Sequence, residues 1–199
     1  PLEKISAIPL GIGNEFRILN LKKENETEIR HKYLLGEKDF LLYVGAIEPH
    51  KNIQGIIEAY SLLAQSIKKR FNLVLAGGKT KYTESFISLA NKRGVVDNII
   101  LIDYIQPGNE DLAILYNLAE LMIFPSFYEG WASPPLEAMK CGTPAIVSDI
   151  PSLKESTGGA AEYCDPNNPQ NISEKIQKIL EDCKFRKNKI DEGLNFAFK

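Results

Sequence analysis

Two glutamates eight positions apart, Glu129 and Glu137, are the residues of this sequence best suited to chemistry. They lie in the stretch EGWASPPLEAMKCG, residues 129–142, which follows an apolar run and a Pro-Ser break. The proline pair in this stretch and the later Gly-Thr-Pro predict a helix that begins at the prolines and ends at Gly142. One carboxylate is therefore expected on a loop and the other in the first turn of a helix. Backbone N–H groups at 131–133, between the two acids, would suit an anionic group.

Lys51 is the basic residue best placed to act together with these carboxylates. It lies in the segment GAIEPHKN, between an apolar run and a helical pattern. A lysine in such a loop can reach a phosphate group as a point charge. Each candidate also has an ordinary alternative: Lys51 as a solvated lysine, Glu129 as a loop acid, and Glu137 as an acid that stabilises the helix dipole. The residue types alone leave these alternatives open.

The elements that must position these residues are short apolar runs that alternate with helical patterns. Strands are expected at residues 40–44, 73–76, 99–102, 121–124, 145–147 and 160–164, after a strand-like run at 5–9. Helices are expected at residues 26–33, 53–67, 82–90, 112–119 (with Asn109 as N-cap), after Pro134, at 152–156 and at 172–183. This alternation predicts the α/β class: a Rossmann-like three-layer domain with a parallel sheet of about six strands.

The carboxyl ends of parallel strands share one edge of the sheet, and ligands bind at that edge. The loops expected there are residues 45–52, 77–81, 103–109, 125–134 and 148–151. Lys51 and Glu129 should therefore lie on the same rim. The chain contains no GxGxxG motif, which argues against an NAD-binding domain.

Length and composition narrow the class of protein further. The chain has 199 residues and 44% hydrophobic content, enough for one well-buried domain. The net charge of -2 gives no basic footprint for nucleic acid. Three cysteines without paired spacing argue against disulfides and zinc, so reduced cytoplasmic thiols are the simpler account. No apolar run is long enough to span a bilayer.

Two segments resemble glycosyltransferase family 4, a family of retaining GT-B enzymes that use nucleotide-sugar donors. Residues 124–149, FPSFYEGWASPPLEAMKCGTPAIVSD, are similar to the family signature, whose hallmark is two glutamates separated by seven residues. Residues 41–52, LLYVGAIEPHKN, resemble its phosphate-binding segment. The resemblance extends over about residues 5–165.

The resemblance implies a role for each candidate residue. Lys51 and Glu129 would be catalytic, the lysine stabilising the leaving diphosphate and the glutamate contacting the transferred sugar. Glu137 would hold the ribose of the donor. The remaining donor-binding residues implied are Gly130, Trp131, Ala132 and Ser133, through backbone N–H groups, and Tyr104 and Ile105 beside the base. Trp131 is expected either as a platform for the sugar or as a packing residue.

The sequence also departs from the family pattern at several of these positions. Ala46 and His50 stand where many members carry arginine, so the diphosphate meets fewer cations. Asp103 replaces a glycine beside the base, and Ala132 and Ser133 replace a glycine and an aliphatic residue. These changes concern the strength of donor binding and the shape of the sugar pocket.

For the whole chain, the resemblance implies the C-terminal, nucleotide-sugar-binding domain of a mannosyltransferase-like GT-B enzyme, spanning residues 1–199. Both ends look truncated, so the N-terminal acceptor domain is expected elsewhere. The full enzyme would transfer a hexose, with mannose favoured, to a glycan or lipid-linked acceptor in polysaccharide biosynthesis. It would need no cofactor or obligate metal, and would act in the cytoplasm, with peripheral membrane association allowed at the inner face. The fragment alone is expected to bind nucleotide weakly and to transfer no sugar.

Two functions other than sugar transfer are alternatives for this chain. One is a sugar-nucleotide epimerase of the same fold. The other is a non-catalytic Rossmann-like domain that binds a nucleotide or a partner protein, and the missing cations at Ala46 and His50 keep it open.

Overall fold

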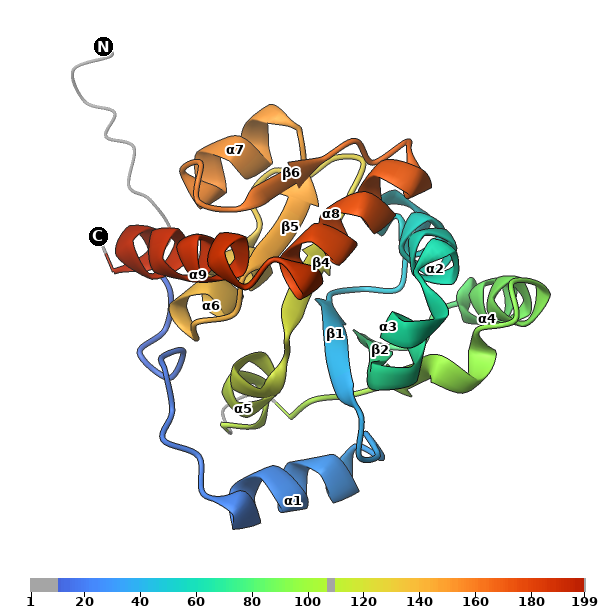
Figure 1. The fold of residues 1–199 in the computed structure, drawn as a ribbon, viewed down its shortest axis with the longest axis horizontal. Coiled ribbons are helices and arrows are strands. Elements are labelled where there is room, and N and C mark those ends of the chain that lie inside the picture. Colours follow the sequence, from blue (N-terminus) through green and yellow to red (C-terminus); the bar gives the residue numbers. More distant parts are fainter. Residues whose placement is uncertain (1–10, 107–109, 199) are drawn as a thin grey trace.

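Six parallel strands form one sheet in the order β3-β2-β1-β4-β5-β6 (Figure 1). The computed structural model describes residues 11–106 and 110–198, so the run at 5–9 and the N-cap expected at Asn109 lie outside the described residues. The strands are β1 (Asp39–Val44), β2 (Phe71–Ala76), β3 (Ile99–Ile102), β4 (Leu121–Phe124), β5 (Ala145–Ser148) and β6 (Glu162–Cys164). All pairs are parallel, which confirms the predicted fold class.

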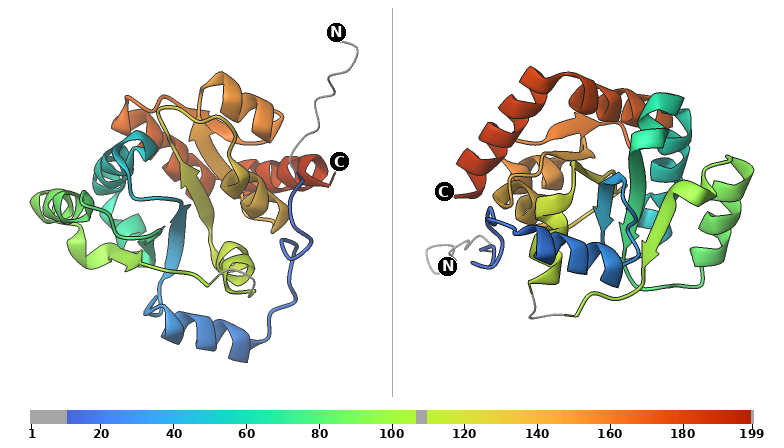
Figure 2. Two further views of the ribbon diagram at one scale, coloured as in Figure 1. Left: turned by 180° about the vertical axis from the view of Figure 1, so that it is seen from behind. Right: turned by 60° about the horizontal axis from the view of Figure 1, so that its bottom comes forward.

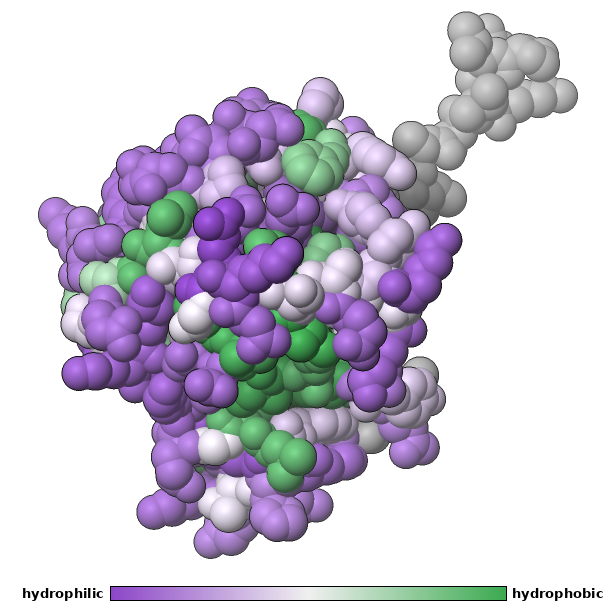
Figure 3. Space-filling model, turned by 90° about the vertical axis from the view of Figure 1, so that its right-hand side faces the viewer, coloured by the Kyte–Doolittle hydropathy of each residue, from purple (hydrophilic) through white to green (hydrophobic). Residues whose placement is uncertain are grey.

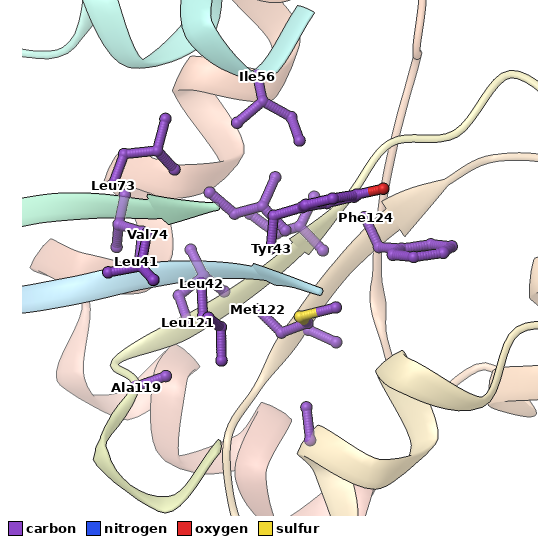
Figure 4. Close-up of a cluster of buried hydrophobic side chains, with 14 of the residues drawn as sticks. Leu41, Leu42, Tyr43, Ile56, Leu73, Val74, Ala119, Leu121, Met122 and Phe124 are labelled. Carbon is purple, nitrogen blue, oxygen red and sulfur yellow. The ribbon is translucent and has the colours of Figure 1, made fainter. Parts of the chain in front are cut away.

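The central strands are apolar because helices cover them on both faces. β2 and β4 are buried along their whole length, and Leu41 and Leu42 of β1 pair with Leu121 and Met122 of β4. Figure 4 shows these side chains as one cluster that ends, toward the carboxyl edge, at the rings of Tyr43 and Phe124. The core therefore reaches up to the edge at which the candidate residues were expected.

The helices pack in two groups, one on each face of the sheet (Figures 1 and 2). One group centres on α2 (Ile53–Leu62), which contacts α4 (Thr83–Lys92) and α8 (Pro169–Glu181), with α3 (Gln65–Arg70) nearby. The other centres on α6 (Ser133–Lys140), which contacts α5 (Asp111–Leu118), α7 (Pro151–Thr157) and α9 (Cys183–Ala197), while α1 (Lys23–Lys32) packs on α5. Right-handed crossovers on either side of β1 produce this division.

The edge strand β3 is less covered than the central strands. Ile99, Ile100 and Leu101 are only half-buried, although each is strongly apolar. Figure 3 faces this side of the molecule and shows apolar side chains gathered at its middle between polar borders.

Within the described residues, no helix is long and apolar enough to cross a membrane.

Two helix predictions were wrong in their boundaries. The single helix expected at 53–67 is broken, because Leu63 takes an extended backbone and turns its side chain into the core at 2% exposure. The last helix expected at 172–183 ends earlier, and α9 was not predicted at all. Asp182 separates α8 from α9 with an extended backbone, and its side chain caps α9 by accepting from the Phe185 N–H at 2.9 Å.

Candidate functional site

Lys51 and Glu129 form an ion pair at the carboxyl edge of the sheet. The Lys51 Nζ lies 2.6 Å from the Glu129 Oε1, and the two side chains are only 17% and 9% exposed. Lys51 ends the short 3₁₀ turn η2 (Pro49–Lys51) after β1, and Glu129 lies in the loop after β4. Because β1 and β4 are neighbours in the sheet, these loops meet, and the expected shared rim is confirmed for these two residues.

The two loops are held together at three successive points. The Phe127 N–H donates to the His50 carbonyl at 2.9 Å. The His50 ring stacks on the Tyr128 ring with centroids 5.0 Å apart, and the ion pair of Lys51 and Glu129 follows. His50, which stands where an arginine was expected, thus packs on an aromatic ring and joins the loops.

Two aromatic rings form an apolar floor under the ion pair. The Lys51 Nζ lies 5.5 Å from the centroid of the Phe124 ring, which stacks on the Tyr43 ring (Figure 4). The Tyr43 hydroxyl donates to the Ala46 carbonyl at 2.8 Å. Burial, and secondly the nearby Glu129 charge, hold the pKa of Tyr43 well above its usual value. The lysine and the glutamate therefore interact over a low-dielectric surface, which strengthens their attraction.

Asn52 ties these loops to a third one and was not predicted as a site residue. Its side chain donates to the carbonyls of Pro125 at 3.0 Å and Pro166 at 2.7 Å, and accepts from the Gly55 N–H at 3.1 Å. Its backbone is left-handed, with φ of 60°, a conformation that asparagine tolerates better than most residues. The available signal was an asparagine directly before a helical pattern, the position of an N-cap.

Helix α6 begins at Ser133, one residue before the prolines, so Glu137 lies in its second turn and not in the first. The prolines carry no N–H and fit the first turn, where such groups lack helical partners. Ala132 is the buried, extended N-cap, and Gly130 is exposed in the loop before it. The backbone donors available near Glu129 are therefore those of residues 130–133.

Glu137 is half-buried and receives a hydrogen bond from a buried tyrosine. The Tyr116 hydroxyl of α5 donates to the Glu137 Oε2 at 2.9 Å. Burial raises the pKa of Glu137, the bond from Tyr116 lowers it, and the charge of Glu15 raises it further. The carboxylate expected to bind ribose thus has one oxygen engaged within the protein.

The remaining predicted residues occupy different parts of the rim. Trp131 packs against the core, and its indole N–H is buried without a hydrogen-bond partner in the part of the chain described. Tyr104 is 70% exposed after β3, and Ile105 packs partly on the core. β1 and β2 separate β3 from β4, so Tyr104 and Ile105 lie at the outer end of the edge.

Across residues 11–106 and 110–198, no group of acidic, histidine or cysteine side chains could hold a metal ion.

Comparison with known proteins identifies a family and several relatives of this chain. Residues 25–195 match the family model of glycosyl transferases group 1. The chain is 35% identical over 185 residues to the serotype-specific mannosyltransferase WbdA of Escherichia coli, covering 92% of this chain and 22% of WbdA. It is 36% identical over 166 residues to the O-antigen chain mannosyltransferase B of Escherichia coli, covering 83% and 43%. The chain thus spans less than half the length of these relatives.

Solved structures support the same fold. WaaG, a glycosyltransferase involved in lipopolysaccharide biosynthesis, superposes with a TM-score of 0.83 at 22% identity, over 99% of this chain and 53% of WaaG. Anabaena Alr3699/HepE in complex with UDP and glucose gives a TM-score of 0.80 at 15% identity, over 94% and 50%. The C-terminal domain of the group 1 protein LpcC from Francisella tularensis gives 0.77 at 20% identity, over 92% and 94%. The chain belongs to the glycosyl transferases of group 1 and has the α/β fold of one half of a GT-B enzyme.

Proposed function

We propose that this chain is the C-terminal, nucleotide-sugar-binding domain of a retaining hexosyltransferase. The observation that carries the proposal is the ion pair of Lys51 and Glu129, held at the carboxyl edge beside the start of α6. Open parallel sheets bind ligands at this edge. The ammonium of Lys51 complements the diphosphate of a nucleoside diphosphate sugar, and the carboxylate of Glu129 can accept from its hydroxyl groups. HepE, which was solved in complex with UDP and glucose, supports a nucleotide sugar as donor.

Each residue has a defined role in this proposal. Lys51 binds the diphosphate and stabilises its charge as it leaves, an electrostatic contribution that grows where water is excluded. The N–H groups of residues 130–133, including those of Trp131 and Ala132, bind phosphate and sugar oxygens. Glu129 accepts from a hydroxyl of the transferred sugar, and Glu137 accepts from the ribose. Tyr104 and Ile105 flank the base at the outer end of the edge.

The relatives narrow the substrate and the process. Both of the Escherichia coli relatives are named as mannosyltransferases, which favours mannose as the sugar. One is named for the O-antigen chain, which favours a glycan or lipid-linked acceptor in polysaccharide biosynthesis. In this proposal the acceptor is bound by a separate N-terminal domain, the enzyme needs no metal or other cofactor, and it works in the cytoplasm, at the inner face of the membrane.

Two competing functions make different predictions. A sugar-nucleotide epimerase of the same fold would also bind a nucleotide sugar, but would change the sugar without an acceptor. A non-catalytic domain would use the rim for a partner protein and ignore nucleotides. The proposed transferase domain binds nucleotide weakly and, alone, transfers no sugar.

Thermal unfolding with UDP and with GDP tests the proposal, since a ligand that binds only the native state raises the melting temperature. We expect saturable stabilisation by one of the two nucleotides, lost in Lys51→Met. Lys175→Met is the matched control, because Lys175 pairs with Glu162 at 2.6 Å in a similar half-buried ion pair on β6 and α8. Stabilisation that survives Lys51→Met, or an absence of stabilisation by either nucleotide, would contradict the proposal. Sugar transfer by this chain alone would contradict the division of labour between two domains.

A further inference from the structure

Tyr116 is a buried side chain whose polar end points at the candidate site. It is fully buried in α5, and its hydroxyl donates to the Glu137 Oε2 at 2.9 Å. The proposed function assigns contacts with the donor to several residues, and it gives Tyr116 no role. A buried phenol that donates to a half-buried carboxylate requires an explanation, because either group alone would be costly to bury.

Both the ring and the backbone of Tyr116 are fixed by contacts. The Phe16 ring packs edge-on against the Tyr116 ring, with centroids 5.8 Å apart and planes at 67°. The Thr143 hydroxyl donates to the Tyr116 carbonyl at 2.5 Å. Phe16 comes from the segment before α1 and Thr143 from the connection between α6 and β5, so two parts of the chain besides α5 itself set the position of this hydroxyl.

The bond determines what the Glu137 carboxylate can still accept. A carboxylate has two oxygens with about four lone-pair sites in all, and Tyr116 occupies one site on Oε2. The bond also fixes the rotation of the carboxylate about its last torsion, which is otherwise broad. Among the residues that the structure describes, no second hydrogen bond reaches this carboxylate, so Oε1 and the second site on Oε2 can accept from a ligand. This is a suitable acceptor for two adjacent hydroxyl groups.

We propose that Tyr116 is a positioning residue. It orients Glu137 so that the carboxylate, through Oε1, accepts hydrogen bonds from the vicinal diol of a nucleoside ribose. This inference rests on the proposed function, in which Glu137 binds the ribose, and adds the residue that makes that carboxylate a pre-oriented acceptor. Pre-orientation strengthens binding because the Glu137 side chain loses less conformational freedom when the ligand binds.

The charged and titratable groups around Glu137 predict how pH affects this arrangement. Glu15 repels the carboxylate, and Cys141, the C-cap residue of α6, has a pKa that burial raises to about 12, so it stays neutral. Burial, and secondly the charge of Glu137, hold the pKa of Tyr116 well above its usual value, so the phenol remains a donor. The bond from Tyr116 lowers the pKa of Glu137, so removing it should move protonation of that carboxyl to higher pH.

Tyr116→Phe tests the proposal, because it removes the hydroxyl and keeps the ring that packs on Phe16. We expect affinity for whichever of UDP or GDP binds to fall about tenfold near neutral pH, roughly the effect of losing one charged hydrogen bond. We also expect the acid limb of binding to start at higher pH than in the unmodified chain. Tyr60→Phe is the control, because Tyr60 also donates a buried hydroxyl, to the Phe71 carbonyl at 2.6 Å, on the other face of the sheet. It should change neither affinity nor the acid limb.

A double variant separates orientation from general destabilisation. In a Glu137→Gln background, Tyr116→Phe should cause no further loss of affinity. An affinity and acid limb in Tyr116→Phe equal to those of the unmodified chain would overturn the inference and leave the proposed function intact. Loss of affinity in Tyr116→Phe that persists undiminished in the Glu137→Gln background would also overturn it. Failure of UDP and GDP to bind the unmodified chain would instead overturn the proposed function, and this inference with it.

Discussion

The Lys51 ammonium and the Glu129 carboxylate lie 2.6 Å apart across the gap between the β1 and β4 loops, largely shielded from water. The cation and the anion that were expected to hold a donor therefore neutralise each other in this structure. In the proposed function, a diphosphate has to draw Lys51 away from Glu129 in order to bind, and a sugar hydroxyl then replaces the lysine at Glu129. The ion pair thus stabilises the two loops, and under the proposed function it also opposes the entry of the donor.

The first prediction concerns the stability of this ion pair. Lys51→Met and Glu129→Gln should each lower the free energy of unfolding, by about 3 kcal/mol for the lysine change, because one charge is left unpaired over an apolar floor. The double variant should be more stable than the sum of the two losses implies. Urea unfolding of the four proteins measures this coupling. Two strictly additive losses would show that the side chains do not depend on each other.

The second prediction concerns competition for Lys51. Glu129→Gln should bind UDP or GDP several-fold more tightly than the unmodified chain, because the lysine no longer has an ionic partner to leave. The gain should shrink as salt is added, since salt screens the charges involved. Titration by calorimetry at two salt concentrations checks both effects. If UDP or GDP bound more weakly to this variant, Glu129 would be shown to assist binding of the diphosphate.

The fold and the meeting of Lys51 with Glu129 could be predicted because both follow from rules that depend only on sequence order. Alternating apolar runs and helical patterns specify a parallel sheet, and parallel strands bring their following loops to one edge. The error at Leu63 arose because a buried leucine has the same apolar signal in a helix and in an extended turn. Helix α9 was missed because charged residues and asparagines interrupt its apolar pattern, and its packing against α6 and α8 compensates for that weak pattern.

Other features of the site depend on contacts between residues far apart in sequence. The bond from Tyr116 to Glu137 joins two helices whose approach depends on how they pack on the sheet. Asn52 bonds to carbonyls 73 and 114 positions away, which no local pattern encodes. Glu137 was assigned to the first turn because the start of α6 was placed at the prolines; the helix begins one residue earlier, at Ser133, which moves Glu137 into the second turn.

The third prediction concerns Asn52. Asn52→Ala should cost about 3 kcal/mol, because it leaves two carbonyls without their donor, removes a helix cap and puts alanine in a left-handed conformation. Asn168→Ala is the matched control: Asn168 is an exposed N-cap of α8 that accepts from the Asn171 N–H at 3.1 Å, and its loss should cost about 1 kcal/mol. Urea unfolding of both variants makes the comparison. Equal losses would mean that capping alone explains Asn52.

The fourth prediction concerns the close approach of the β1 and β2 ends. A Cβ at position 77 would lie 1.8 Å from the Gly45 carbonyl oxygen, so Gly77→Ala must push the two loops apart. We expect a clear loss of stability, of roughly 1–3 kcal/mol as for other overpacked positions, with weaker nucleotide binding because the neighbouring Lys51 loop shifts. Gly78→Ala is the control, since the nearest atom to its Cβ would be 3.8 Å away. A Gly77→Ala protein as stable as Gly78→Ala would show that the approach is not maintained in solution.

The last prediction sets stability against binding at Glu137. Burial, and then the charge of Glu15, raise the pKa of Glu137 in spite of the bond from Tyr116. The native state therefore holds this proton more tightly than the unfolded chain does, so the contribution of Glu137 to stability is present at low pH and is lost as pH rises through the native pKa. Glu137→Gln removes that cost, and its amide oxygen can still accept from Tyr116. The variant should melt higher than the unmodified chain at neutral pH, by about 2–4 °C for each 1 kcal/mol relieved. This difference should disappear in acid, and stabilisation by nucleotide should be smaller than in the unmodified chain. A lower melting temperature at neutral pH would mean that the ionised carboxylate supports the fold, and that its burial is not a cost accepted for binding.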